Sequence, residues 1–375
     1  MKLLLNNLSR LLTGAVFVFS GFVKGVDPWG TAYKLEDYFM VYGMEWANGY
    51  ALFLSILLCA VEFAIGAALL FNLRMQLTAW LLLLMMSFFT LLTFYDALYD
   101  PVPDCGCFGD AIKLSNWATF YKNLILMAPT VWIFCNRNKF SPFLNPKRQT
   151  ITTLAFLIGF SAFSYYYSMH LPLIDFREWK LGNKMTANET ADDRVYVIYQ
   201  NKVSGDRQEY LSPDFPWNDS IWMSQWEFVD QRIEKDQDEL IHNLMAEDAN
   251  GNDFTDLILQ SPGILVVVAP DLTTASDRGM KRIAAVEKSS IELAIPLVVL
   301  TSNLPEEAEQ LINQYGMHTD TFFADDIVLK TMIRSNPGLM LFYNGYVAGK
   351  WHYNDFPDEN KLQRIIENMP ERYPD

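Results

Sequence analysis

The sequence is poor in the residues that build metal and nucleotide sites. It has four histidines in 375 residues, all isolated from one another, so a zinc site is not expected. It contains no C-x-x-C, H-E-x-x-H, G-x-G-x-x-G or P-loop motif, which excludes the usual signatures of zinc proteases, dinucleotide-binding folds and P-loop enzymes. The four cysteines all lie before residue 136, and this placement excludes a small secreted fold held by disulfides.

Basic residues are also scarce in the second half of the chain. Residues 1–170 hold 11 Lys and Arg against 9 Asp and Glu, whereas residues 171–375 hold 18 against 35. Such an acidic region does not neutralise phosphates, so nucleic acid is excluded as a partner. The same charge argues against docking of this region on anionic lipid headgroups.

Long apolar runs dominate the first half. Runs of about 20 mainly apolar residues are typical of membrane helices, and five are expected, at residues 5–24, 50–71, 76–97, 119–136 and 151–170. The first resembles a signal peptide, but no small-residue cleavage site follows it. Membrane lipid is therefore an expected partner, and the first run is expected to remain as a helix.

Basic residues predict the orientation of these helices. Lys2, Arg10, Arg74 and the 137–148 loop fall on one side, whereas the opposite loops carry most of the acids. The positive-inside rule places the basic side in the cytoplasm. The N-terminus is then cytoplasmic, and everything after residue 170 is periplasmic in a bacterial inner membrane.

A C-x-C pair, Cys105 and Cys107, stands in a short polar loop between the third and fourth runs. Thiols this close can form a small strained disulfide, which is easier to reduce than a relaxed one. The flanking Asp104 and Asp110 are expected to raise the thiol pKa and to slow attack as thiolate. Three interpretations remain open: a redox pair, a structural disulfide, or ligands of a soft metal.

Two carboxylates lie inside the apolar runs. Glu62 is near the middle of the second run and Asp96 is at the outer end of the third. Because a carboxylate at membrane depth is costly, Glu62 is expected to be protonated or paired inside the bundle. It is a candidate proton or ligand contact beside a bound quinone, or it bonds a neighbouring helix. Asp96 has the same candidate role, or it only caps the membrane interface.

The first half resembles the DoxX-like superfamily and, within it, the MauE-type membrane proteins, over residues 5–136. The resemblance is carried by residues 10–14 (RLLTG), 19–24 (FSGFVK), 27–31 (DPWGT) and 104–109 (DCGCFG). It implies a four-helix membrane domain over 1–140 and thiol–disulfide chemistry in the envelope, beside a thioredoxin-like partner. The fifth helix, over 141–170, and the large outer region are additions to that pattern.

The outer region has alternating strand and helix patterns. Residues 171–239 are expected to be a linker and a β-rich extension. Residues 240–375 follow the order strand, helix, strand, helix, hairpin, helix, which predicts a mixed α/β sheet. This order resembles a thioredoxin-like fold, and Ser335 to Gly338 stand where that fold has its cis-proline loop.

That resemblance has one departure. The junction where thioredoxins carry their thiols reads APDLTTAS over residues 269–276, without cysteine. Since the thiolate is the nucleophile of thioredoxin chemistry, this domain is expected to bind rather than react. The expected partner-binding loop comprises Asp271, Thr273, Asn336 and Pro337.

The whole chain is therefore expected to be a multi-domain inner-membrane protein. Its leading function is a component of thiol–disulfide oxidoreduction, in which Cys105 and Cys107 exchange electrons with an envelope thiol protein held by the outer domain. A non-catalytic membrane-anchored scaffold with a structural disulfide is the alternative. A small-molecule transporter is a third interpretation, although no inverted repeat is visible in the sequence.

Overall fold

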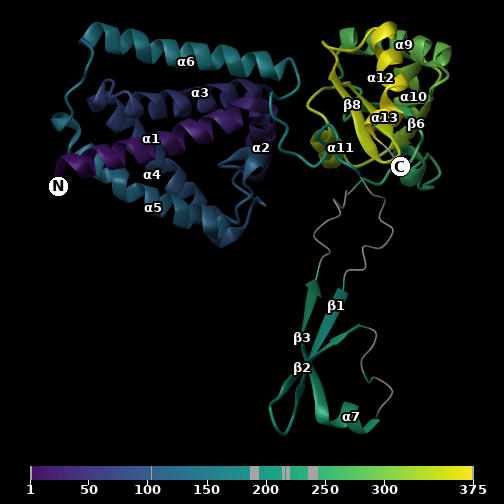
Figure 1. Cartoon of the computed structure of the whole chain (residues 1–375), viewed down its shortest axis with the longest axis horizontal. Helices are drawn as coiled ribbons and strands as arrows, with labels where there is room; N and C mark the ends of the chain where they lie inside the picture. The colour runs from purple at the N-terminus through teal and green to yellow at the C-terminus, as the bar shows by residue number, and fades with distance from the viewer. Residues whose placement is uncertain are drawn as a thin grey trace.

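The structure, a computed structural model, describes residues 2–102, 104–185, 194–212, 216, 220–234 and 244–373. A helical bundle formed by the first half of the chain lies beside a mixed α/β domain formed by the last third (Figure 1). A small antiparallel sheet is inserted between them in the sequence.

Four helices are long and apolar enough to cross a membrane. They are α1 (Lys2–Val26), α3 (Ala51–Leu70, preceded by the 3-10 turn Glu45–Tyr50), α4 (Met75–Tyr99) and α5 (Asn116–Cys135). These match the first four expected runs within a few residues. The chain is thus an integral membrane protein with four candidate spans.

Helix α2 (Pro28–Val41) fills the segment between the first two spans, where no element was predicted. The Asp27 side chain caps its start by accepting from the Gly30 N–H at 3.1 Å, and Pro28 occupies its first turn. Both are favourable helix-start signals. This helix lies across the end of the bundle that faces the α/β domain (Figure 1).

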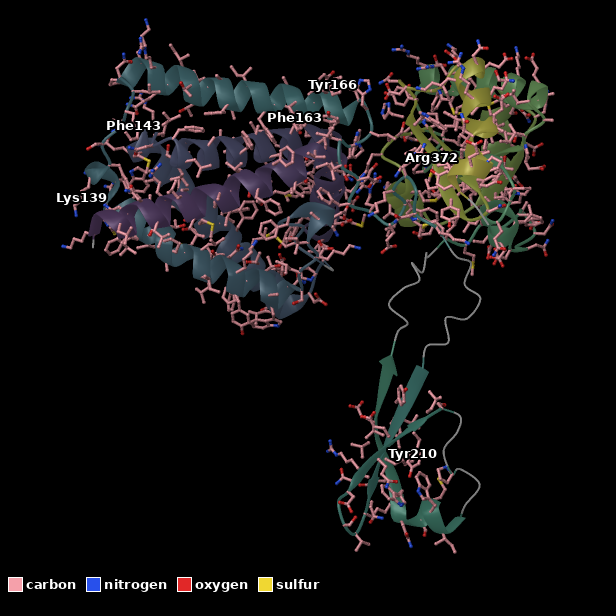
Figure 2. The ribbon with its side chains drawn as sticks, viewed as in Figure 1. Lys139, Phe143, Phe163, Tyr166, Tyr210 and Arg372 are labelled. Carbon is pink, nitrogen blue, oxygen red and sulfur yellow. The ribbon has the colours of Figure 1, made fainter. Side chains whose placement is uncertain are left out.

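The fifth predicted span corresponds to α6 (Pro146–Ser168), a helix of 23 residues. It is not among the four helices with sufficient length and hydropathy, so a fifth span remains a prediction. The helix packs along α3, with Phe160 stacked on Phe63 at 4.1 Å between ring centroids. Phe143, just before it, lies at the end of the bundle far from the α/β domain, whereas Tyr166 lies near that domain (Figure 2).

The α/β domain is built on a five-stranded sheet in the order β6-β5-β4-β7-β8. Strands β4, β5 and β6 are parallel, whereas β7 and β8 are antiparallel additions beside β4. Every residue of β4 and β5 is buried, as expected for strands with helices on both faces. The elements are α8 (Thr255–Leu259), β4 (Ile264–Ala269), α9 (Asp277–Glu292), β5 (Leu297–Thr301), α10 (Pro305–Asn313), β6 (Asp320–Phe323), α11 (Asp326–Met332), β7 (Gly338–Tyr343), β8 (Tyr346–His352), α12 (Glu359–Glu367) and α13 (Met369–Arg372).

The predicted β-rich extension is a separate three-stranded antiparallel sheet in the order β2-β1-β3. The middle of the sheet carries an aromatic cluster in which Tyr199 contacts Trp222 at 4.8 Å. Its elements are β1 (Arg194–Asn201), β2 (Arg207–Leu211), α7 (Ser220–Gln225) and β3 (Trp226–Glu234).

Candidate functional site

The C-x-C loop between α4 and α5 folds back onto α1. The Ser20 hydroxyl donates to the Cys107 carbonyl oxygen at 2.7 Å. Gly106 turns the chain with a φ of 62°, which suits a residue without a Cβ, and its N–H donates to Asp104 Oδ1 at 2.9 Å. The turn brings the Cys105 and Cys107 sulfur atoms to 3.7 Å. They are free thiols in this structure, within reach of each other.

The two thiols have opposite surroundings. The hydrogen bond from Cys105, together with the charges of Lys122 and Lys24, lowers the pKa of the Cys107 thiol. The hydrogen bond to Cys107 and burial raise the pKa of the Cys105 thiol well above its usual value. Since the thiolate is the nucleophile, the arrangement favours Cys107 as the attacking sulfur and Cys105 as the one that keeps its proton.

The predicted effect of the neighbouring aspartates is wrong for Cys107. Asp104 pairs with Lys34 at 3.0 Å, and Asp110 pairs with Arg334 at 3.1 Å. Each carboxylate is thus balanced by a cation from another part of the chain. The charges that act on Cys107 are those of lysines, not of its acidic neighbours in sequence.

Glu62 is paired inside the bundle, as one reading of the sequence expected. Its carboxylate forms an ion pair with Lys24, and both side chains are at most one-tenth exposed. Lys24 belongs to the last turn of α1 rather than to an outer loop. Because Lys24 also acts on Cys107, the Glu62 pair belongs to the same site as the thiols.

Asp96 does not merely cap the membrane interface. Its side chain is completely buried, and it accepts a hydrogen bond from the Tyr38 hydroxyl at 2.7 Å. Helix α2, which supplies Tyr38, covers the end of α4 and removes Asp96 from solvent.

A cavity of about 600 Å³, lined mainly by apolar side chains, opens beneath the C-x-C loop. Both cysteines, Tyr38, Lys24 and Glu62 all contribute to its wall. Three further wall residues on α3 and α4 are themselves exposed; these are Leu57, Leu84 and Phe88.

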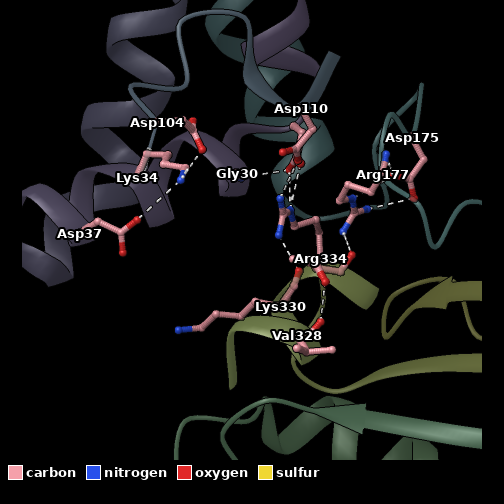
Figure 3. Close-up of polar contacts among 12 residues, drawn as sticks. Gly30, Lys34, Asp37, Asp104, Asp110, Asp175, Arg177, Val328, Lys330 and Arg334 are labelled. Atoms are coloured by element: carbon pink, nitrogen blue, oxygen red, sulfur yellow. Dashed lines mark hydrogen bonds and ion pairs between the residues drawn. The ribbon is translucent and has the colours of Figure 1, made fainter. Parts of the chain in front are cut away.

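Arg334, just before β7, joins the α/β domain to the C-x-C loop (Figure 3). Its guanidinium binds both carboxylate oxygens of Asp27, at 2.9 and 3.1 Å, and reaches Asp110 as well. The Arg334 side chain is 5% exposed. Burial alone would raise the pKa of Asp27, but the charges of Arg334 and Arg177 hold it below its usual value.

A second group of contacts between the bundle side and the α/β domain lies near Arg334. The His170 ring, at the end of the α6 segment, binds Asp355 at 2.8 Å, so this histidine contacts the α/β domain rather than the cysteine loop. The segment from His170 to Arg177, called the strap below, follows α6. Its Asp175 pairs with Arg177 and Lys350 at 2.8 and 2.7 Å. The same strap donates from Arg177 to the Thr331 carbonyl oxygen at 2.9 Å.

The predicted partner-binding loop is assembled at one edge of the sheet. The Asn336 amide donates to the Asp271 carbonyl oxygen at 2.7 Å, and the Asp271 carboxylate accepts from Thr273 at 2.6 Å. The Asn336–Pro337 peptide bond is cis, as the resemblance implied. Arg334, which contacts the bundle, directly precedes this loop. The predicted partner-binding loop therefore lies on the side of the α/β domain that meets the bundle.

Sequence reasoning missed Tyr38, Lys122 and Arg334. Arg334 acts through contacts with segments far away in the chain, whereas Lys122 acts on Cys107 in the loop just before its own helix; nothing in their local sequence indicates either role. Tyr38 had one weak signal, because Asp27 and Pro28 mark the start of the helix that carries it.

Comparison with known proteins finds a similarity for part of the chain. No curated protein sequence matches it. Residues 2–136 match the family model described as methylamine utilisation protein MauE, so the bundle that holds the C-x-C loop is similar to that family.

Proposed function

We propose that the protein carries out thiol–disulfide exchange at the outer face of a bacterial inner membrane. Cys107 is the attacking thiolate and Cys105 is the resolving thiol. The observation that carries the proposal is that two thiols 3.7 Å apart have opposite surroundings, one beside two lysines and one beside Tyr38 and Asp96. A loop that is merely cross-linked has no need of this difference.

The exchange has two steps. The Cys107 thiolate attacks one sulfur of a disulfide in a partner protein, the partner's S–S bond breaks, and one partner sulfur leaves as thiolate. The Cys105 thiolate then attacks Cys107 in the mixed disulfide and displaces the second partner thiolate. The partner has gained two electrons and the Cys105–Cys107 pair has lost two; the reverse sequence oxidises the partner.

The cavity fits a lipid-soluble quinone as the second redox partner of the pair. Its apolar walls suit a ring that arrives through the membrane. Lys24 would donate to an oxygen of the quinone, and the Glu62 carboxylate would accept from a hydroxyl of the reduced form. When bound, the quinone would take two electrons and two protons from the dithiol. The bundle would thereby connect an envelope protein to the membrane's electron carriers.

The α/β domain is proposed to be thioredoxin-like and to hold the partner. Its parallel β4 and β5, the antiparallel β7–β8 pair and the cis-proline loop support this assignment. The sequence has no cysteine after residue 135, so the domain contributes binding rather than exchange. A partner segment bound at Asp271 and Asn336 would lie at the edge of the sheet that meets the C-x-C loop.

The same proposal makes α6 a fifth span. The backbone N–H of Arg74, before α4, donates to Gln149 at the start of α6, and Trp29, at the start of α2, donates to the carbonyl of Ser168 at its end. The helix therefore covers the whole distance between the two ends of the bundle. If the basic loops are cytoplasmic, as the positive-inside rule predicts, a fifth span would put the C-x-C loop and the α/β domain in the periplasm.

Covalent trapping tests the exchange. In cells carrying the full chain with Cys59→Ala and Cys135→Ala, a further Cys105→Ser change is expected to accumulate a mixed disulfide at Cys107, seen after acid quenching and maleimide labelling. The matched Cys107→Ser variant is expected to trap little, because its remaining thiol keeps its proton. If neither variant captures a partner and both only lose thermal stability, the pair is structural and the scaffold alternative holds.

A further inference from the structure

The strap contributes two apolar side chains to the wall of the cavity. Ile174 and Phe176 line it together with Tyr38 and Tyr42 from α2. The two strap residues are 43% and 40% exposed, although both are large and apolar. An apolar ligand in the cavity can therefore cover surface on both of them, which favours its binding.

The residues that alternate with these two contact the α/β domain instead. Asp175 pairs with Lys350 of β8 at 2.7 Å, and Lys350 also donates to the Trp179 carbonyl oxygen at 3.0 Å. Arg177 donates to the Thr331 carbonyl oxygen of α11 at 2.9 Å (Figure 3). Consecutive side chains of the strap thus belong in turn to the cavity and to the α/β domain.

Both ends of the strap are held by the α/β domain as well. Directly before it, the Met169 carbonyl oxygen accepts from the Asn354 amide at 2.8 Å, and the His170 ring binds Asp355. Just after it, Trp179 is 2% exposed and packs in the core of the domain. Because these contacts attach the strap along its length, we expect it to move with the α/β domain.

The strap enters the same cavity as the thiols. Cys105, Cys107 and Lys24 also line this cavity. A quinone that covers Ile174 and Phe176 would therefore lie in the cavity that the dithiol shares. The contacts that fix the α/β domain and those available to the quinone come from neighbouring residues of one short segment.

We propose that the strap is a movable wall of the quinone site, and that a quinone bound there holds the α/β domain in its docked position. The inference rests on the proposed function and adds how that site is regulated. In the docked form the ligand touches Ile174 and Phe176; after undocking, the strap has left with the domain and these contacts are lost. A ligand that binds one of two states more tightly shifts the equilibrium toward that state.

Binding of a short-chain quinone tests the wall. The purified full chain is titrated with ubiquinone-1 by isothermal calorimetry. Ile174→Ala/Phe176→Ala is expected to weaken binding about tenfold, since both truncated side chains lose apolar contact with the ligand. Leu173→Ala is the matched control, because Leu173 is 56% exposed and lies outside the cavity wall that the structure describes. Its affinity is expected to stay within about twofold of the parent.

Hydrogen exchange tests the link to docking. Arg334→Met, which weakens docking, first identifies the amides of residues 330–336 whose exchange quickens on undocking. In the parent, saturating ubiquinone-1 is expected to slow these amides about tenfold, the same factor as the affinity loss in Ile174→Ala/Phe176→Ala, because coupling is reciprocal. In the double variant, the same occupancy is expected to slow them by less than about twofold.

Each result decides one point. Parent-like affinity in Ile174→Ala/Phe176→Ala would overturn the strap as a wall of the site, and reporter amides that do not respond to ubiquinone-1 would overturn its link to docking. A parent that does not bind ubiquinone-1 would overturn the quinone assignment together with this inference, whereas trapping of a partner at Cys107 measures the exchange separately. If the double variant does not fold, Phe176→Ala alone, with a smaller loss of affinity in the same direction, gives the answer.

Discussion

The centre of the α/β sheet and the part of the membrane bundle around the C-x-C loop bury opposite kinds of residue. The α/β domain is built around strands such as β4, whose side chains are apolar and entirely enclosed. The end of the bundle that meets it encloses Lys24, Glu62 and Asp96 instead. Apolar burial makes a rigid frame that performs no chemistry, whereas buried charge is costly and is retained where it does something. Under the proposed exchange function, the reactive part of this protein is in the membrane region, and the α/β domain is its frame.

The sharpest test of this contrast is to remove one member of the buried pair. Lys24→Met leaves the Glu62 carboxylate without its cation and is expected to cost about 3–5 kcal/mol of stability. Thermal unfolding of the purified chain in detergent measures the loss. The double variant Lys24→Met/Glu62→Leu is expected to recover most of it, because no unpaired charge remains. A single variant within about 1 kcal/mol of the parent would mean that the pair contributes no more than a surface contact.

Acid should act first on the α/β domain, at His352. This ring is 2% exposed and accepts from the Asn354 N–H at 3.1 Å. Burial lowers its pKa to about 4, with Asp355 opposing and His170 adding to the shift. The unfolded chain takes up the proton near pH 6.5, so this contribution is complete above about pH 6.5 and is lost as the pH falls toward 4. The loss is expected to be about 3 kcal/mol.

Unfolding midpoints of the parent and of His352→Gln between pH 7 and 4 check this. The variant is expected to show a flatter profile over that window. Parallel profiles in the two proteins would show that another group controls the acid response.

The contact between the bundle and the α/β domain is expected to contribute less free energy than the packing inside either region. Arg334→Met removes the cation from Asp27 and Asp110 and is expected to cost about 2 kcal/mol of docking, the value of charged hydrogen bonds that are largely buried. Hydrogen exchange in the 104–110 loop should quicken accordingly. Lys281→Met, which removes an exposed pair with Asp277 on the same domain, is the control and should leave the loop unchanged. Equal exchange in both variants would mean that Arg334 does not hold the loop.

The sequence predicted the elements far better than the contacts between them. Hydropathy located the four spans, and the alternating strand and helix patterns after residue 240 indicated the α/β sheet, because both signals are local. The burial of Asp96 could not be predicted, since it depends on how α2 folds across the bundle end. The pairing of Asp27 with Arg334 joins positions 307 residues apart, and neither neighbourhood in the sequence indicates the other. The pKa of Cys107 was predicted from its acidic sequence neighbours, although the hydrogen bond from Cys105 and the charges of Lys122 and Lys24 lower it.

The strap from His170 to Arg177 has a consequence for how often the C-x-C loop is accessible. It ties the α/β domain to its docking site on the bundle, so docking is intramolecular, with an effective concentration of about 1 mM for a short tether. Suppose that the polar contacts would give an untethered α/β domain a Kd of about 10 μM for the bundle. The tethered domain would then be undocked about 1% of the time. A partner too large to enter the docked form would meet the thiols only in that fraction, and its apparent affinity would be about a hundredfold weaker than its intrinsic one.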